Sequence, residues 1–582
     1  MDNNVALIAQ CEAKAKQWLT PDFDETTRKA VQAMLDNADK TELVESFYRD
    51  LEFGTGGLRG IMGAGTNRMN IYTVGMATQG FANYLKKNFK DRKQISTVVC
   101  YDCRNNSDLY ARTVANIFSA NGIKVYLFDE MRPTPECSFA IRHFGAQGGV
   151  NLTASHNPRE YNGYKAYWED GAQVLAPHDK GIIDEVGKVT IADVKFEGNN
   201  DLIQMVGADV DAPYLEQIKT ICIDPEVIRH QHDLKIVYTP LHGAGRMLIP
   251  QSLKYWGFDN VHCVAEQMVK NGNFPTVDRP NPEFAEALTL GLRDAKQLDA
   301  DILMASDPDA DRVGMACKND KGEWVLINGN QTCLIFLWYI ITNRQAVGKM
   351  KPTDFIVKTI VTTEVIREIA EKNHIEMRDC YTGFKWIARE IKLSEGKQQY
   401  IGGGEESYGF LAEDFVRDKD AVSACSLLAE ICAYAKDHGK TLYDILMDIY
   451  KEYGYSKEFT INVERPGKTG AEEIQQMMTD FRANPPKELA GVPVCLWKDY
   501  KTLEATQADG TKTQLVMPET SNVLQWFCTD GTKVSVRPSG TEPKIKFYLE
   551  VKDTLKEAAD FAACEARAEQ KIEAIKASLK LA

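Results

Sequence analysis

One pattern recurs three times along this chain and limits its fold more than any other feature: an apolar strand, a polar loop, an amphipathic helix and a second strand. The first strands of the three copies are Ser96–Tyr101, Leu234–Tyr238 and Phe355–Thr359. In every copy apolar residues recur at helical spacing after the strand, and a Gly or Asn follows them, as βαβ units require. Because a domain's length separates one copy from the next, the repeat predicts three similar mixed α/β domains rather than a solenoid.

The two ends of the chain lack this pattern. Residues 1–50 have the spacing and caps of helices and read as an N-terminal extension. The C-terminal part combines strands with two helices, Ala471–Phe481 and Leu555–Leu579, which is typical of an α+β domain. Its predicted strands are Glu458–Val463, Val523–Phe527, Lys533–Val536 and Lys544–Val551. We therefore expect four domains, with boundaries at 1–206, 207–319, 320–452 and 453–582.

Composition excludes several classes of function. The formal net charge of −14 argues against nucleic acid or an anionic membrane as a partner. No stretch approaches the ~18 apolar residues of a membrane span, and the N-terminus lacks the features of a signal peptide. The 14 cysteines form no secreted-type framework. We expect a cytoplasmic protein, either a monomer or a weak dimer.

Ser155 is the first candidate for chemistry. It stands in Asn-Leu-Thr-Ala-Ser-His-Asn-Pro, just after an apolar stretch that predicts a short buried strand. A loop past the carboxyl end of a strand is where α/β proteins usually hold their reactive groups. A serine hydroxyl needs a partner that takes its proton, and His156 and Lys165 are near in sequence. Taken alone, this serine is more typical of a turn or a helix cap than of a reactive group.

Asp307, Asp309 and Asp311 form a second candidate site. They stand at every second residue directly after the apolar stretch Ile302–Ala305, so alternate carboxylates can converge on one hard cation. The segment is no EF-hand, because Arg312 stands at its sixth position in place of the required glycine. Three carboxylates beside a basic residue suit Mg²⁺ shared with a phosphate; the alternative is a solvated acidic turn.

Glycine-rich segments supply the remaining candidates. Phe53–Gly60 contains Arg59 and is predicted to be a flexible loop or a plain turn, not a dinucleotide fingerprint. Thr382–Trp386 and Gly402–Gly409 follow apolar stretches and could hydrogen-bond sugar hydroxyls, or be tight turns. Arg537–Pro543 combines a guanidinium, hydroxyls and a flexible backbone, which suits a phosphate. A loop that closes a hairpin is the alternative there.

Taken together, the motifs Thr-Ala-Ser-His-Asn-Pro, Asp-Pro-Asp-Ala-Asp-Arg, Gly-Glu-Glu-Ser and Arg-Pro-Ser-Gly-Thr-Glu-Pro, in this order, resemble the α-D-phosphohexomutase superfamily. The resemblance runs from about Phe53 to the C-terminus. Phe53–Gly60 and Thr382–Trp386 are most similar to the phosphoglucomutase and phosphopentomutase-like branch. The resemblance implies four domains around a central cleft, which in chain order carry the phosphoserine, bind the metal, recognise the sugar and bind phosphate.

The resemblance also implies roles for individual residues. Ser155 would carry a phosphoryl group, with Arg59, Lys165 and His156 beside it. Asp307, Asp309 and Asp311 would hold Mg²⁺ together with an oxygen of phospho-Ser155. The implied substrate-binding residues are Arg312, Thr382, Gly383, Lys385, Glu405, Ser407, Arg537, Ser539, Gly540 and Thr541. Some relatives have Gly-His after the Glu-x-Ser element, where this chain has Tyr408-Gly409. Lys165 therefore becomes the better acid/base candidate.

These roles imply a phosphosugar mutase. It would interconvert hexose 1-phosphate and 6-phosphate, with glucose as the expected sugar and a sugar 1,6-bisphosphate as intermediate and activator. Mannose or pentose phosphates are alternative substrates, and a sugar-bisphosphate synthase is an alternative on the same scaffold. A non-catalytic phosphosugar-binding relative is less consistent with the sequence, because it would have no need to retain Ser155 and all three aspartates.

Overall fold

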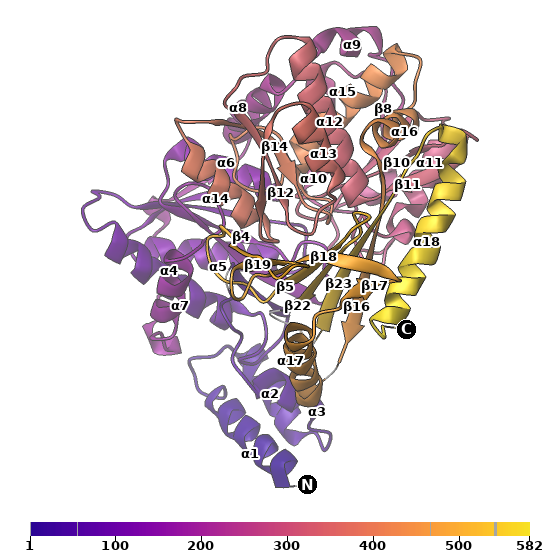
Figure 1. Cartoon of the computed structure of the whole chain (residues 1–582). Helices are drawn as coiled ribbons and strands as arrows, with labels where there is room; N and C mark the ends of the chain where they lie inside the picture. Colours follow the sequence, from indigo (N-terminus) through magenta and orange to yellow (C-terminus); the bar gives the residue numbers. More distant parts are fainter. Residues whose placement is uncertain (1, 55, 466, 540–543, 582) are drawn as a thin grey trace.

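The computed structural model describes residues 2–54, 56–465, 467–539 and 544–581. Its strands form four main sheets that follow one another along the chain, and helices pack around each of them (Figure 1). The predicted architecture of three mixed α/β domains and an α+β C-terminal domain is confirmed. Within the described residues, no helix is long and apolar enough to cross a membrane.

The first domain contains a six-stranded sheet that presents Ser155. Its strands, in spatial order, are β1 (Gly57–Ile61), β5 (Tyr161–Trp168), β4 (Gly148–Leu152), β2 (Ser96–Tyr101), β3 (Lys124–Phe128) and β6 (Ile203–Val206). Its helices are α4 (Ile71–Asn88), α5 (Ser107–Ala120), α6 (Thr134–Phe144) and α7 (His178–Val186). Because β2 and β4 are parallel neighbours, the loops after them lie at the same edge of the sheet.

The N-terminal extension packs on this domain as a small helical unit of its own. It consists of α1 (Asp2–Gln17), α2 (Glu25–Asp36) and α3 (Thr41–Phe47). Trp18, Phe23 and Phe47 form its buried cluster together with Tyr72 of α4. Asp24 caps α2 by accepting a hydrogen bond from the Thr27 amide at 2.9 Å.

The second domain has a five-stranded sheet in the order β11 (Trp324–Ile327), β10 (Val313–Lys318), β9 (Ile302–Ser306), β7 (Ile236–Thr239) and β8 (Val261–Cys263). Its helices are α8 (Ala208–Thr220), α9 (Pro225–His230), α10 (Gly245–Trp256) and α11 (Thr289–Gln297). Strand β11 pairs with β10 although it follows the boundary expected after residue 319. We propose that this domain extends to Ile327; the other boundaries remain proposals.

The third domain is a four-stranded sheet under five helices. Its strands, in spatial order, are β13 (Glu376–Cys380), β12 (Asp354–Thr359), β14 (Gln399–Gly404) and β15 (Phe410–Leu411). Its helices are α12 (Gly329–Ala346), α13 (Val365–Lys372), α14 (Phe384–Ser394), α15 (Ala421–Asp437) and α16 (Leu442–Tyr453). One hydrophobic cluster contains buried residues of this domain and of the other three domains.

The fourth domain is an antiparallel sheet with two helices, α17 (Gly467–Ala483) and α18 (Phe561–Ser578). Helix α18 runs along the outer side of the sheet (Figure 1). The main strands of the sheet, in spatial order, are β16 (Tyr455–Glu464), β23 (Lys544–Asp553), β22 (Lys533–Pro538), β21 (Leu524–Cys528), β18 (Val492–Asp499), β19 (Glu504–Gln507) and β20 (Lys512–Gln514), and β17 (Glu488–Leu489) pairs with β18. The closing helix was expected from Leu555 but begins at Phe561. Leu555 is instead buried in the core, after which the chain makes a short 3₁₀ turn at Ala558–Asp560.

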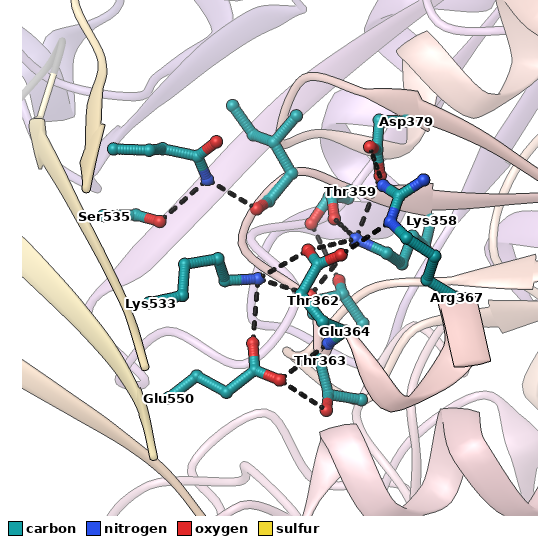
Figure 2. Close-up of polar contacts among 12 residues, drawn as sticks. Lys358, Thr359, Thr362, Thr363, Glu364, Arg367, Asp379, Lys533, Ser535 and Glu550 are labelled. Carbon is teal, nitrogen blue, oxygen red and sulfur yellow. Dashed lines mark hydrogen bonds and ion pairs between the residues drawn. The ribbon is translucent and has the colours of Figure 1, made fainter. Parts of the chain in front are cut away.

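A buried polar network joins the third and fourth domains (Figure 2). We call it the III–IV network; its charged members are Lys358, Glu364, Arg367, Asp379, Lys533 and Glu550. The Lys533 ammonium lies 2.9 Å from Glu364 Oε1 and 2.9 Å from Glu550 Oε2. On the other side, Lys358 Nζ lies 2.9 Å from both Glu364 Oε1 and Asp379 Oδ1. Three cations and three carboxylates thus balance each other at this contact.

Candidate active site

Ser155 lies in the loop between β4 and β5, as the sequence predicted. It is buried, and its backbone has φ +51°, in the left-handed region. For a residue other than glycine this conformation costs about 1–2 kcal/mol, so the surroundings must hold it. One restraint is local: the Ser155 amide donates a 2.8 Å hydrogen bond to Thr153 Oγ1. Backbone strain of this kind is concentrated at functional sites.

The Ser155 side chain reaches across from the first domain to the second. Its Oγ donates to Asp307 Oδ2 at 2.7 Å and lies 3.2 Å from His156 Nδ1. Burial, together with the positive charges of Arg312 and Arg59, lowers the pKa of His156 well below its usual range. His156 is therefore a neutral imidazole that can accept a proton from the hydroxyl.

The three aspartates come together at the carboxyl end of β9. Their side chains are almost completely buried, and one ligand atom from each lies within 4.8 Å of the others. Asp309 Oδ1 and Asp311 Oδ1 have no hydrogen-bond partner within the described part of the chain. Burying carboxylate oxygens without partners is costly unless something else binds them. The oxygen-only donor set fits a hard divalent cation such as Mg²⁺.

The pKa values of this carboxylate cluster diverge. Burial, and then the charges of Asp309 and Asp311, raise the pKa of Asp307 well above its usual range. Burial acts in the same direction on Asp309, but the Lys165 charge and several hydrogen bonds outweigh it and lower the pKa of Asp309. Burial and the charge of Asp309 act to raise the pKa of Asp311, but the charges of Lys165 and Lys419 outweigh them and lower it. Asp307 is therefore the carboxyl of the cluster on which a proton or a nearby cation is most favoured.

Two lysines contact the carboxylate cluster. Lys165, on β5, lies 2.7 Å from Asp309 Oδ2 and 3.0 Å from Asp311 Oδ2. Lys419, just before α15, lies 3.1 Å from Asp311 Oδ2. Burial acts to lower the pKa of Lys165, but the charges of Asp309 and Asp311 outweigh burial and raise this pKa above its usual range. In this arrangement Lys165 is an ammonium that can donate a proton or bind an anionic oxygen.

Arg59 does not stand in a flexible loop. The segment Gly57–Ile61 is strand β1 and pairs antiparallel with β5, placing Arg59 opposite Gly163. Gly57 has φ +131°, and a Cβ there would lie 1.7 Å from the Tyr164 carbonyl oxygen, so glycine is needed for this close approach. The exposed Arg59 side chain donates to Asn157 Oδ1 at 3.3 Å, which places it beside the Ser155 loop.

The third domain contributes its predicted loops to the same region. The Gly383 amide donates a 2.8 Å hydrogen bond to Glu405 Oε1, which joins the Thr382-Gly383 turn and its neighbour Lys385 to the Glu405–Ser407 loop. That loop contacts the second domain where the Val313 amide donates to the Tyr408 carbonyl at 3.0 Å. The adjacent Arg312 forms a 2.7 Å ion pair with Glu283.

The predicted phosphate site lies in the fourth domain at the end of β22. Arg537 stands opposite Lys546 of β23, so two cations share this end of the sheet. The Ser539 amide donates to the Lys544 carbonyl at 2.8 Å. Gly540 and Thr541 lie outside the described residues.

Comparison with known proteins decides the family. Four family models, for domains I, II and III and the C-terminal domain of phosphoglucomutase/phosphomannomutase, match residues 50–192, 212–322, 328–453 and 461–568 in order. The chain belongs to the phosphoglucomutase/phosphomannomutase family. The predicted superfamily resemblance is confirmed, and the chain is a phosphosugar mutase of this family.

Individual relatives cover nearly the whole chain. A phosphoglucomutase from Staphylococcus aureus (strain MRSA252) is 36% identical over 513 residues, which is 87% of this chain and 91% of the relative. A phosphopentomutase from Homo sapiens is 34% identical over 565 residues, 93% of this chain and 92% of the relative. The crystal structure of a phosphoglucomutase/phosphomannomutase family protein from Burkholderia thailandensis has the same fold, with a TM-score of 0.65 at 18% identity; 91% of this chain and 97% of that one are covered.

In this member of the family, two residues at the site were missed by the sequence analysis. Lys419 contacts Asp311, and Thr134, at the start of α6, donates to Asp309 Oδ2 at 2.8 Å. The run Arg417-Asp-Lys-Asp420 directly before an apolar helix was a signal for Lys419, because clustered charges next to a buried element need partners. Thr134 gave no signal beyond its place at a helix start.

Proposed function

We propose that this mutase interconverts glucose 1-phosphate and glucose 6-phosphate through phospho-Ser155 and glucose 1,6-bisphosphate. The observation that supports this most strongly is the 2.7 Å contact between Ser155 Oγ and Asp307 Oδ2. It joins the candidate phosphoryl carrier of the first domain to the buried carboxylate cluster of the second. A serine that served only as a turn would have no need of that partner.

The carboxylate cluster is proposed to be a Mg²⁺ site. Asp307, Asp309 and Asp311 would hold the ion together with an oxygen of phospho-Ser155. When bound, Mg²⁺ supplies positive charge that offsets the negative charge on the transferring phosphoryl oxygens. The two unpartnered carboxylate oxygens of the cluster support this assignment.

The protein's own residues are proposed to divide the remaining work. His156 accepts the proton when Ser155 Oγ is phosphorylated again, because it is neutral and adjacent. Lys165 and Arg59 bind oxygens of the transferred phosphoryl group, with Lys165 also the proposed proton donor. Both the phosphoserine and the substrate phosphate carry close to two negative charges. Without these cations, their mutual repulsion would oppose binding.

The third and fourth domains are proposed to hold the sugar and its other phosphate. Glu405 and Ser407 would bind sugar hydroxyls, supported by Arg312 and by the Thr382, Gly383 and Lys385 turn. Arg537, Ser539, Gly540 and Thr541 would bind the phosphate that is not reacting. Such a site must accept the sugar in both orientations, since the bisphosphate turns over between the two transfers.

Ser155 is tested by substitution and by mass. Ser155→Ala should lose mutase turnover by several orders of magnitude, whereas Ser119→Ala, a buried serine in α5, should keep it. After incubation with glucose 1,6-bisphosphate, intact wild-type protein should become one phosphoryl group heavier, and Ser155→Ala should not. Near-normal turnover of Ser155→Ala, or phosphorylation at another residue, would refute the assignment.

Pentose phosphate is the second candidate substrate, favoured by the human phosphopentomutase that is as similar to this chain as the staphylococcal phosphoglucomutases. Coupled assays with glucose, mannose, ribose and deoxyribose phosphates would rank the substrates by kcat/KM. Net release of bisphosphate in the same assays would instead indicate a bisphosphate synthase.

We also propose that the protein is cytoplasmic, which its 14 unpaired cysteines support, and that it is a monomer or a weak dimer.

A further inference from the structure

Arg104 is a buried arginine that none of the sequence motifs includes. It stands in the loop after β2, at the same edge of the sheet as the Ser155 loop, and is only 3% exposed. Its guanidinium touches one carboxylate, Asp102 Oδ2 at 3.3 Å. A buried guanidinium needs further acceptors for its five N–H groups.

Those acceptors are the main chain of the Ser155 loop. Arg104 Nη2 donates to the Ser155 carbonyl oxygen at 2.6 Å and to the Asn157 carbonyl oxygen. Arg104 Nη1 donates to the carbonyl oxygens of Pro158 at 2.9 Å and Tyr161 at 3.0 Å. One side chain thus binds four carbonyl groups in the turn that carries the proposed phosphoryl acceptor.

These bonds act on the middle of a loop whose other backbone hydrogen bonds to neighbouring strands lie at its two ends. There the Thr153 amide donates to the Gly163 carbonyl at 3.1 Å, and the Glu160 carbonyl accepts from the Met62 amide at 2.8 Å. Between them, Ser155 has a left-handed conformation. A planar guanidinium fixes the relative directions of the carbonyl groups it binds, which a flexible ammonium cannot do. The guanidinium thus bonds the carbonyl group of the same residue whose Oγ contacts Asp307.

Arg104 is itself held from two sides. Asp102 Oδ1 accepts hydrogen bonds from the Arg104 amide and from Ser107 Oγ, both at 2.9 Å, which fixes Asp102 at the start of α5. On the opposite side the guanidinium lies 5.3 Å from the centre of the Phe274 ring, in the second domain. The arginine is thus anchored at the junction with the domain that supplies Asp307.

We propose that Arg104 is a positioning residue whose guanidinium holds the Ser155 loop in the conformation that directs Oγ at the carboxylate cluster. It acts through the loop backbone, and among the described residues no hydrogen bond or ion pair joins it to a proposed substrate-binding residue. This inference rests on the proposed role of Ser155. It assigns to the end of β2 a function that neither the motifs nor the carboxylate cluster provides.

The test is Arg104→Lys, with Arg344→Lys as matched control. Arg344 is a largely buried arginine that pairs with Glu413 and Asp354 in the third domain. Because misplacing a reacting group by about 1 Å can cost about 100-fold in rate, kcat of Arg104→Lys should fall by about that factor. The KM for glucose 1-phosphate should stay within about threefold. Arg344→Lys should keep kcat even if it unfolds at a lower temperature.

Amide hydrogen exchange provides a readout independent of turnover. Peptides covering residues 153–161 should exchange faster in Arg104→Lys than in the wild type, while peptides of β2 and α5 should not change. If Arg104→Lys fails to fold, Asp102→Asn should still show a smaller loss of kcat and a smaller increase in the exchange of residues 153–161. This substitution removes the charge that orients the guanidinium.

Two results would overturn the proposal: a kcat of Arg104→Lys within about threefold of the wild type, or a raised KM with unchanged exchange in residues 153–161. Failure of the proposed function would look different. In that case wild-type protein would not be phosphorylated on Ser155, or Ser155→Ala would keep its turnover, whatever Arg104→Lys does.

Discussion

The junction of the first and second domains and that of the third and fourth domains both bury several charged groups, but they balance them differently. In the III–IV network, every carboxylate contacts at least one of three cations (Figure 2). Asp379 Oδ1 and Glu550 Oε2 of the network have no hydrogen-bond partner within the described residues, but each lies 2.9 Å from a lysine ammonium. In the carboxylate cluster, Asp309 Oδ1 and Asp311 Oδ1 also lack such a partner, and the one ion pair found for them in the described part of the chain is the 3.9 Å contact of Arg312 Nε with Asp311 Oδ1. The three aspartates of the cluster are at most 1% exposed, whereas Glu364, Arg367 and Asp379 of the III–IV network are only partly buried. The less complete pairing therefore occurs in the more deeply buried group.

The difference separates a structural network from a reactive one. Buried ions that are fully paired hold two surfaces in one register, and removing one partner destabilises the fold. Buried carboxylate oxygens without close partners cost stability unless a ligand binds them, so Asp309 Oδ1 and Asp311 Oδ1 point to a ligand at the cluster. Substitutions at the carboxylate cluster should therefore affect turnover more than stability, and substitutions in the III–IV network should do the reverse.

The largest expected effect is that of Asp309→Asn on turnover. The change removes one charge but keeps an oxygen that can accept from Thr134 Oγ1. Because positive charge at the transferring phosphoryl group contributes several kcal/mol to transition-state stabilisation, turnover should fall by about 100-fold or more. The Mg²⁺ concentration for half-maximal activity should rise. Steady-state assays across a Mg²⁺ titration measure both.

The melting temperature in the presence of a chelator provides the complementary measurement. It should fall less in Asp309→Asn than in Lys533→Met, because Lys165 keeps Asp311 as an ion-pair partner at 3.0 Å. Chelator-treated wild-type protein that remained fully active would contradict the metal assignment. If Asp309→Asn lost much stability but kept normal turnover, the carboxylate cluster would be a structural network like the III–IV network.

Much of the fold was predictable because it depends on local periodicity. The strand Ser96–Tyr101 was predicted with the bounds that β2 has, and the helix predicted after it is α5. The errors occurred where a distant partner decided the structure. Phe53–Gly60 was expected to be a loop because it is rich in glycine, but Gly57–Ile61 pairs with β5, about 100 residues further along. The helix expected from Leu555 begins later because Leu555 is buried in the core of its domain.

In the candidate site, too, the residues that could be predicted are those whose signal lies within one segment of the sequence. Ser155 and the three aspartates could be predicted because each motif has its residue types and spacing within one loop. For Lys419 and Arg104 the sequence indicated at most a charged residue beside a buried element, since their partners lie in other loops that only the folded chain brings near. Arg104 follows a buried strand in the way that Ser155 does, but its four partners are backbone carbonyl groups, which leave no signal in residue type or spacing.

The next effect in size is that of Lys533→Met on stability. Lys533 is almost completely buried, and its loss leaves the carboxylates of Glu364 and Glu550 without their shared cation. Breaking a buried ion pair in this way costs about 3–5 kcal/mol. Thermal and denaturant unfolding should show a lower midpoint for the transition that includes the fourth domain. The kcat of protein that is still folded should be close to normal.

The matched control for Lys533 is Lys552→Met. Lys552, on the same sheet, forms a partly exposed ion pair with Glu368 at 3.0 Å, which should contribute at most about 1 kcal/mol. The double variant Lys533→Met/Glu550→Leu should recover part of the lost stability, because no unpaired charge remains on Glu550. Equal destabilisation by the Lys533 and Lys552 substitutions would show that the buried ion pairs of the III–IV network contribute no more stability than a partly exposed pair.

The smallest expected effect is a pH dependence next to the III–IV network. Burial, and then the negative charge of Glu550, raise the pKa of Glu458 to about 7 from its usual 4.5. Ser456 Oγ donates to Glu458 Oε1 at 2.7 Å. Because the unfolded chain releases this proton at lower pH than the folded one, the wild type should lose stability as the pH rises from about 4.5 to about 7. Above about pH 7 the loss should be complete and constant.

Glu458→Gln isolates this effect, since glutamine stays neutral at every pH. Relative to the wild type, the variant should be more stable at pH 8 than at pH 5 by on the order of 1–3 kcal/mol, the size expected for a shift of this direction on a half-buried group. Glu569→Gln, an exposed carboxyl of α18 paired with Lys457, should show no comparable dependence. Unfolding curves of the three proteins between pH 5 and pH 8 measure it. A stability difference between Glu458→Gln and the wild type that does not change with pH would mean that Glu458 is charged in the folded protein, and that the charge balance next to the III–IV network includes a fourth carboxylate.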